Sequence, residues 1–514
     1  MKKLLLLLII PCIGYSQNKV VDATRNWKEK EGYNILASFA ELLSIPNHGS
    51  DAVNIRRNAK LIGENFTNRG FKMQLLEVEG APPAIYGELK TPNAHRTVCF
   101  YVHYDGQPVD PSRWVNPPFE PTLYSNALFN NGKPIPMPKA GDKINENWRL
   151  YGRSTSDDKA PIIALLAAID ALQNSEIAFT SNIKLFFDGE EEMGSPHVMD
   201  YLTNFNSLFE DIDVWLMVDG PVFLTGQPVL NFGSRGITGM ELTVYGATRP
   251  LHSGHYGNYA PVPGQMLAAL LATMKDEKGK VLIEGYYDTV EPISDFEREQ
   301  INKIPKIDEQ IRVDLGIAQP EGDGETIYKR LLLPSLTIRG LSSGNVGALA
   351  RNVIPNIAVA TLGMRLVKGN DPEQMMNLVE AHIKKQGWHI VYDEPDMETR
   401  MNYPRIIKVE REKDGGPASK ISMNHPAVLP VIESIKSFTG DNLVLIPSSG
   451  GSNNAKVAVL DGIKMPGISI SIANHDNNQH AENENIRIGN LWYGIDLMGV
   501  LLTMPEPKTE LKKK

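Results

Sequence analysis

Acidic residues and histidines in this sequence stand directly after short apolar runs. They are His103, Asp105, Asp188, Glu190, Glu191, Glu192, Asp219 and, after a short loop, His480. Ligands of open α/β sheets bind beyond the carboxyl ends of the strands, so four such strands would gather these side chains in one cluster. Packed carboxylates repel one another and raise one another's pKa unless cations compensate them. Because imidazoles with carboxylates suit Zn²⁺ or a similar divalent ion, the cluster predicts a metal site.

A fifth segment, Gly152–Lys159, brings two more carboxylates to the start of a predicted helix. Asp157 and Asp158 stand where a carboxylate commonly caps the free N–H groups of a helix. One of them can therefore cap the helix while the other binds metal. The run Glu190–Glu192 has a solvated acidic turn as its alternative, but its place directly after the apolar run Ile183–Phe187 favours a site.

Three short β-rich runs would position these side chains, namely Thr97–Val102, Ile183–Phe187 and Val214–Val218. A helical pattern over Asp158–Gln173 lies between the first two runs. Strands that alternate with helices indicate an α/β sheet with helices on its faces. Residues 108–138 hold eight prolines, which predict a long surface loop.

The pattern changes near Gly233 and indicates a second, α+β domain. Strands are predicted at 239–245, 335–339, 358–366 and 389–392, and helices at 263–276 and 372–386. Because helix Ala427–Thr439 and strand Gly467–Ile472 return to the α/β pattern, the second domain is predicted to be an insertion. The predicted divisions are a signal peptide at 1–16, a catalytic metal-binding domain at 17–232 and 406–514, and the inserted domain at 233–405.

The N-terminus has the pattern of a secretory signal peptide. Two lysines precede the apolar run Leu4–Ile10, and the small residues Gly14 and Ser16 stand before Gln17. A run this short does not span a bilayer, so cleavage after the first sixteen residues is expected. The sequence therefore predicts a secreted or periplasmic protein without a stable membrane span. Lipid anchoring at Cys12 is not expected, because the preceding residues make a poor lipidation box.

Composition narrows the possible functions further. The 514 residues carry 61 acidic and 52 basic side chains, a formal charge of −9. No basic surplus exists to neutralise phosphates, so no nucleic-acid partner is expected. With Cys12 removed, Cys99 is the only cysteine left and cannot form an internal disulfide. Its apolar surroundings predict a small buried side chain.

Five motifs occur in an order that resembles the co-catalytic zinc exopeptidases of clan MH. They are His103-Tyr104-Asp105, Ser156-Asp157-Asp158-Lys159, Asp188-Gly189-Glu190-Glu191-Glu192-Met193-Gly194-Ser195, Asp219 and His480. The family includes carnosinase-type dipeptidases, glutamate carboxypeptidase and aminoacylase, and the carnosinase-like dipeptidase branch is the most similar. The resemblance implies a phosphorylase/hydrolase-like α/β catalytic domain with a central mixed, mainly parallel sheet. The insertion would be an α+β, ferredoxin-like lid and dimerisation domain.

The resemblance also implies a centre with two divalent ions, Zn²⁺ first and Mn²⁺ or Co²⁺ as alternatives. His103 and Asp219 would bind one ion, Glu192 and His480 the other, and Asp157 would bridge both. In the family, the peptide bond after this aspartate is cis. Two divalent ions are balanced by three carboxylates and one bridging hydroxide, and a buried site favours such a neutral set.

Glu191 is left without a metal, as a general base requires. The implied reaction is hydrolysis of dipeptides or short peptides by a metal-activated bridging water, with Glu191 passing its proton to the leaving amine. Asp105, two positions after His103, is placed by the strand period to hydrogen-bond the His103 ring. We expect Glu190 and Asp188 to lie at the surface or behind the ligands.

The inserted domain holds residues that match substrate-binding positions of the family. His252, in Leu251-His252-Ser253-Gly254, would reach the active site of a partner subunit and stabilise the oxyanion, which requires a homodimer. Asn352 would grip the substrate, and Arg365 would anchor its free carboxylate. Ser452, after two glycines, would belong to a substrate loop. A structural salt bridge, a satisfied hydrogen bond or a plain turn is the alternative at these positions.

Other functions stay open. An N-acyl-amino-acid deacylase would use the same ligands, and a peptide-binding protein without activity could share the scaffold. A serine hydrolase is a further alternative. Ser154 and Ala160 replace glycines common in the family, and Asp188 replaces a more usual Glu. None of these changes removes a ligand or the base.

Overall fold

The computed structural model describes residues 12–413 and 415–506, which form two compact units. The first unit holds the described residues up to Phe232, together with Ile421–Ile446 and those from Asn454 onward, and the second holds Gly233–Lys420 and Pro447–Asn453. The second unit is therefore inserted into the first. It ends at Lys420 rather than at the predicted residue 405, and a short later segment returns to it.

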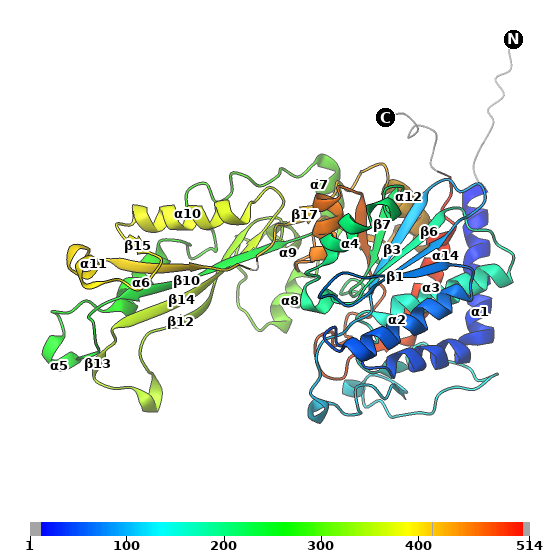
Figure 1. The fold of residues 1–514 in the computed structure, drawn as a ribbon, viewed down its shortest axis with the longest axis horizontal. Helices are drawn as coiled ribbons and strands as arrows, with labels where there is room; N and C mark the ends of the chain where they lie inside the picture. Colours follow the sequence, from blue (N-terminus) through cyan, green and yellow to red (C-terminus); the bar gives the residue numbers. More distant parts are fainter. Residues whose placement is uncertain (1–11, 414, 507–514) are drawn as a thin grey trace, which may run out of the picture. The chain divides into compact units, whose positions relative to one another are not determined.

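An eight-stranded mixed sheet runs through the described part of the first unit (Figure 1). In order across the sheet its strands are β1 (Lys72–Leu76), β2 (Ala84–Leu89), β6 (Asn182–Asp188), β3 (Thr97–His103), β7 (Val214–Val218), β19 (Gly467–Ile470), β8 (Val229–Asn231) and β18 (Val444–Ile446). Strands β6, β3, β7 and β19 are parallel neighbours. Their carboxyl ends therefore meet at one edge of the sheet.

The central strands are wholly buried because both faces of the sheet are covered. Helices α1 (Cys12–Leu43), α3 (Lys159–Asn174) and α14 (Ile488–Leu502) pack on one another, and α3 contacts β3 (Figure 1). Strand alternation places a second cluster on the other face, where α4 (Val198–Asn204) packs on Tyr101 and Phe186. Cys99 is buried in this cluster, as predicted, and burial raises the pKa of its thiol.

The predicted signal peptide falls mostly on residues 1–11, which lie outside the described residues. Its remaining residues, 12–16, begin α1, which continues past the predicted cleavage point to Leu43. Among the described residues, no helix combines the length and the apolar content that crossing a membrane requires.

The second unit contains a five-stranded sheet among its described residues. The order is β12 (Ser335–Ser342), β14 (Ile357–Leu366), β10 (Gly236–Tyr245), β16 (Ile406–Arg411) and β15 (His389–Val391). Helices α6 (Pro263–Ala272) and α10 (Pro372–Lys385) share a hydrophobic core with this sheet. The predicted boundary at 405 cut off β16, which pairs with β10. The α/β catalytic unit with an inserted α+β unit, which the sequence predicts, is confirmed.

A small three-stranded sheet was not predicted. It joins β4 (Thr122–Tyr124) and β20 (Asn485–Arg487) to either side of β5 (Arg149–Tyr151). In the ladder, Tyr151 stands opposite Asn485. This pairing matters for the site, because β5 leads into the segment that carries Asp157 and β20 follows the loop that carries His480.

Candidate metal centre

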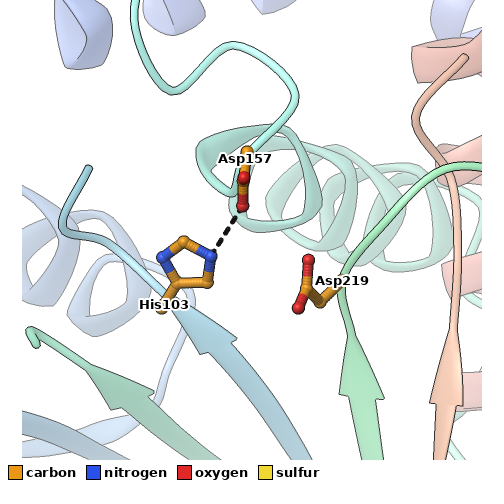
Figure 2. A group of neighbouring side chains, drawn as sticks. All are labelled: His103, Asp157 and Asp219. Carbon is orange, nitrogen blue, oxygen red and sulfur yellow. Dashed lines mark hydrogen bonds and ion pairs between the residues drawn. The ribbon is translucent and has the colours of Figure 1, made fainter. Parts of the chain in front are cut away.

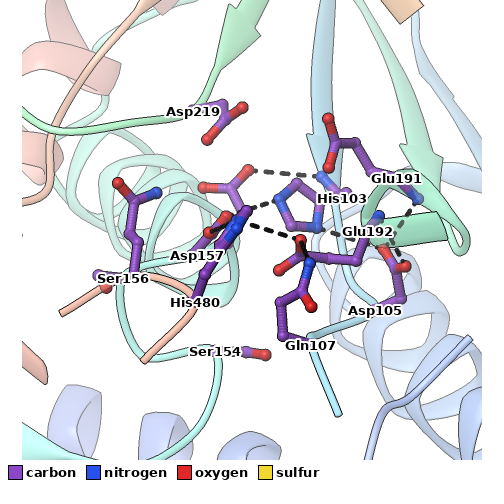
Figure 3. Close-up of polar contacts among 12 residues, drawn as sticks. His103, Asp105, Gln107, Ser154, Ser156, Asp157, Glu191, Glu192, Asp219 and His480 are labelled. Atoms are coloured by element: carbon purple, nitrogen blue, oxygen red, sulfur yellow. Dashed lines mark hydrogen bonds and ion pairs between the residues drawn. The ribbon is translucent and has the colours of Figure 1, made fainter. Parts of the chain in front are cut away.

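Five of the predicted site residues form two overlapping groups in the first unit. One group is His103, Asp157 and Asp219 (Figure 2), and the other is Asp157, Glu192 and His480. In each group the candidate ligand atoms all lie within 4.8 Å of one another. Asp157 belongs to both groups and lies between the two histidines (Figure 3).

The fold brings these side chains together at the carboxyl edge of the parallel strands. His103 is the last residue of β3, and Asp219 directly follows β7. Glu192 lies in the 3₁₀ turn η3 (Glu191–Met193), shortly after β6. Asp157 stands just before α3, and His480 lies in the loop between β19 and β20. Ligand binding at this edge is what open α/β sheets favour.

Ring nitrogens and carboxylate oxygens face one another at short range. His103 Nε2 lies 2.9 Å from Asp157 Oδ1, and His480 Nε2 lies 3.1 Å from Asp157 Oδ2 and 3.2 Å from Glu192 Oε2. Although burial opposes it, hydrogen bonding to both rings lowers the pKa of Asp157. Burial and the charge of Asp157 raise the pKa of Asp219, and they raise that of Glu192 to about 7.

The donor set fits a divalent cation. Carboxylate oxygens and imidazole nitrogens without a thiolate are the ligands of Zn²⁺, Mn²⁺ or Co²⁺ sites. Three clustered carboxylates carry negative charge that two neutral imidazoles do not offset. In the described part of the chain, Asp158 Oδ1 is also buried without a hydrogen-bond partner, and burial raises the pKa of that carboxyl. A cation at this place would relieve the repulsion.

Asp105 lies behind His103, where the sequence placed it. Its Oδ1 is 3.3 Å from His103 Nδ1, and its two oxygens accept hydrogen bonds from the backbone N–H groups of Glu191 and Glu192 at 3.1 Å. One buried carboxylate thus orients the His103 ring and the turn η3. Glu191 belongs to neither candidate metal group, and burial raises the pKa of its carboxyl well above the ordinary value.

Asp188 and Glu190 are buried, so a surface position for them is wrong. Asp188 accepts hydrogen bonds from the Tyr101 and Ser195 hydroxyls at 3.0 and 2.6 Å. Glu190 accepts one from the backbone N–H of His197 at 2.9 Å. The acidic run is therefore folded inward, and two of its carboxylates hold the loop together.

Asp157 and Asp158 differ in their contacts. Asp158 stands at the N-cap position of α3 but makes no capping hydrogen bond through its side chain. Asp157 alone belongs to both candidate metal groups. The peptide bond between the two aspartates is cis, as the resemblance implied.

Two polar residues of the site were not found by sequence reasoning. Gln107 Nε2 donates a hydrogen bond to Glu192 Oε2 at 2.7 Å. Glu484 is buried and accepts a hydrogen bond from the backbone N–H of Asp157 at 3.0 Å, across 327 sequence positions. No local spacing rule reveals a contact between segments this far apart.

The four predicted substrate-binding residues form two separate pairs in the second unit. Arg365 Nη1 donates to Ser452 Oγ at 2.9 Å. His252 lies in β11 (Leu251–His252), which pairs with β13 (Val353–Ile354), and Asn352 accepts a hydrogen bond from the following Ser253 N–H. Strand β14 separates the pairs, since it begins at Ile357, five positions after Asn352, and Arg365 is near its end. At about 3.3 Å per residue, the separation is roughly 25 Å.

Known proteins resemble this chain over most of its length. The model of peptidase family M20/M25/M40 matches residues 99–503. The Cys-Gly metallodipeptidase of Schizosaccharomyces pombe is 24% identical over 485 residues, covering 91% of this chain and 95% of that protein. The Beta-Ala-His dipeptidase of Mus musculus is 24% identical over 424 residues, covering 81% and 78%.

Solved structures share the fold along most of the chain. An M20 family metallo-carboxypeptidase from Sulfolobus solfataricus has a TM-score of 0.69 and 28% identity, covering 91% of this chain and 98% of that one. Human carnosine dipeptidase 1 has a TM-score of 0.66 over 95% of this chain and 98% of that one. At 21% identity, this second likeness shows the fold alone.

The prediction of a secreted or periplasmic protein is wrong. The fungal Cys-Gly metallodipeptidases that match between 81% and 91% of the chain are cytosolic. Only the charged and apolar pattern at the N-terminus supported export, and most of that pattern falls on residues 1–11, outside the described residues.

Three observations point to one family: a cluster of candidate metal ligands at the carboxyl edge of an α/β sheet, an inserted α+β unit, and a family match over most of the chain. Dipeptidases recur among the similar proteins, from fungi to mammals. This chain belongs to peptidase family M20/M25/M40, as a metal-dependent hydrolase of its dipeptidase group.

Proposed function

We propose that the protein hydrolyses dipeptides with two divalent ions, one held by His103 and Asp219, the other by Glu192 and His480, with Asp157 shared. The observation that carries the proposal is the pair of ligand groups that meet at Asp157. Zn²⁺ is the first candidate, and Mn²⁺ or Co²⁺ are alternatives. A divalent ion bound there polarises the scissile carbonyl and lowers the pKa of a water molecule.

Glu191 is the proposed general base. It lies on the turn η3 beside Glu192 but outside both candidate metal groups. Its carboxylate takes the proton of the attacking water and delivers it to the nitrogen of the leaving amine. Burial raises the pKa of this carboxyl. Asp105 keeps the proton of His103 on Nδ1, so that Nε2 is free to bind metal.

The proposal is tested with a panel of dipeptides, including Cys-Gly and β-Ala-His, beside N-acetyl amino acids. The purified chain is assayed with Zn²⁺, Mn²⁺ or Co²⁺ and again after treatment with a chelator. Hydrolysis of dipeptides that the chelator abolishes is expected. Exclusive cleavage of the acylated amino acids would instead favour a deacylase.

Arg365 is the proposed anchor for the free carboxylate of a dipeptide. Its guanidinium contacts Ser452 and has no carboxylate partner among the described residues, so it is available for a two-pronged contact. We expect Arg365→Ala to raise KM for a dipeptide by about tenfold or more, since charged hydrogen bonds contribute about 1.5–3 kcal/mol. Initial rates on the dipeptide and on its C-terminal amide check this. An equal loss on both substrates would contradict a carboxylate anchor.

We propose a homodimer formed through the second unit. Strand β12 is an edge strand, and exposed apolar side chains lie on it and on the loop after it, with Leu341 59%, Val346 86% and Leu349 68% exposed. Unpaired edges and apolar patches favour pairing with a second copy. His252 and Arg365 stand about 25 Å apart along β14. The proposal is therefore that His252 reaches the active site of the partner subunit rather than that of its own chain.

Light scattering coupled to size exclusion checks the dimer. The parent chain is expected at twice the mass of one chain, about 114 kDa from 56.9 kDa per chain. Leu341→Asp should give the monomer mass, because a charge replaces an apolar contact. Val53→Asp is the matched control, since Val53 is 71% exposed in the first unit. A monomeric parent would rule out the dimer.

A further inference from the structure

Glu484 is a fully buried carboxylate to which the reaction assigns no part. It belongs to neither candidate metal group. Its Oε1 accepts hydrogen bonds from Ser156 N at 2.8 Å, Ser156 Oγ at 3.0 Å and Asp157 N at 3.0 Å, and its Oε2 accepts them from Arg153 Nη1 at 2.8 Å and Ser154 N at 2.9 Å. Five donors from one short segment thus converge on one side chain.

The segment that supplies these donors is irregular and needs such an acceptor. Ser154 has a φ of 62°, and the chain joins α3 only after Asp158. Buried backbone N–H groups outside regular structure must find a hydrogen-bond partner, because an unpaired buried donor destabilises the fold. The buried charge of Glu484 is in turn offset by the Arg153 guanidinium.

Glu484 also joins this segment to the loop that carries His480. It stands four positions after His480 and directly before β20. Its backbone oxygen accepts a hydrogen bond from Gly152 N–H at 3.0 Å, which continues the pairing of β20 with β5. Backbone and side chain of one residue therefore hold the two segments whose Asp157 and His480 lie 3.1 Å apart.

We propose that Glu484 is a positioning residue that fixes Asp157 where the two metal groups share it. The inference rests on the proposed function, in which Asp157 binds both ions. A ligand that is already ordered before binding costs less free energy to use, so the contacts of Glu484 favour metal binding. Partners behind metal ligands typically contribute about 10- to 100-fold in metal affinity.

Glu484→Gln is a sharp test because it keeps the shape of the side chain. One acceptor oxygen becomes an NH₂ donor, which must face either the Ser156 and Asp157 N–H groups or the Arg153 and Ser154 donors. In either orientation at least two of the five hydrogen bonds are lost. Ser156→Ala is a milder variant that removes only the contact from Ser156 Oγ.

Glu482→Gln is the matched control. Glu482 lies on the same loop and undergoes the same change of charge, but it pairs with Arg113 Nη2 at 2.6 Å and is partly exposed. It contacts none of the candidate metal ligands through any described hydrogen bond or ion pair. We expect the Glu482→Gln variant to bind metal as tightly as the parent chain.

The experiment titrates the metal-free chains with Co²⁺ and follows calorimetric heat and visible absorption, with thermal unfolding measured separately. Binding should weaken about 10- to 100-fold in Glu484→Gln and about two- to tenfold in Ser156→Ala. A parent chain that binds no Co²⁺ would overturn the proposed function itself. A parent that binds Co²⁺ while both variants bind it equally well would overturn the role of Glu484 alone. If Glu484→Gln does not fold, Ser156→Ala decides by the same criterion.

Discussion

Replacing Glu191 with Gln is expected to lower kcat for dipeptide hydrolysis by about 10²- to 10⁴-fold, the usual contribution of a general acid or base. The amide cannot accept the proton of the attacking water. The bound metal should be unchanged, because Glu191 belongs to neither group of candidate ligands. Steady-state kinetics at saturating substrate check the fall in kcat, and the metal content of the same sample checks that the bound metal is unchanged.

Glu210→Gln is the control for this substitution, since Glu210 is exposed at the surface of the first unit. It should keep the kcat and the metal content of the parent chain. A Glu191→Gln enzyme with the parent kcat would refute the assignment of the base. A variant that lost its metal would instead make Glu191 a ligand.

Among single changes to the candidate ligands, Asp157→Asn is expected to remove the most bound metal. Asp157 is the residue common to both candidate groups, with His103 Nε2 on one oxygen and His480 Nε2 on the other. An amide offers one neutral oxygen in place of two charged ones, so affinity for both ions should fall together. Activity at micromolar metal should fall below detection, and elemental analysis should find less than one ion per chain.

Asp200→Asn, at an exposed position of α4, is the matched control and should retain both metal and activity. Loss of a single ion from Asp157→Asn, with the other retained, would show that Asp157 is not shared. In that case the two groups would be independent sites rather than one centre.

The sequence predicted the position of the candidate site because burial leaves a local signature. Strands β3 and β7 are covered on both faces, so they read as continuous apolar runs, and the polar residue after each run stands out. His103 and Asp219 could be found in this way. The ligand roles came from the resemblance of five ordered motifs and remain predictions.

The rest depends on contacts that no local pattern carries. Glu484 and Gln107 act on segments far away in the chain, so only the folded structure brings them into the site. Asp188 and Glu190 were expected to lie at the surface or behind the ligands. They are buried, and hydroxyl and N–H groups donate hydrogen bonds to their carboxylates. Strand β16 fell outside the predicted insertion because its pairing with β10 joins segments that are far apart in the chain.

Counting the metal ions bound to the purified parent chain, with dipeptide hydrolysis measured on the same sample, tests the central claim most directly. We predict two divalent ions per chain, loss of hydrolysis when a chelator removes them, and recovery when Zn²⁺ is returned. Dipeptide hydrolysis that persists in a chain free of metal would contradict the account.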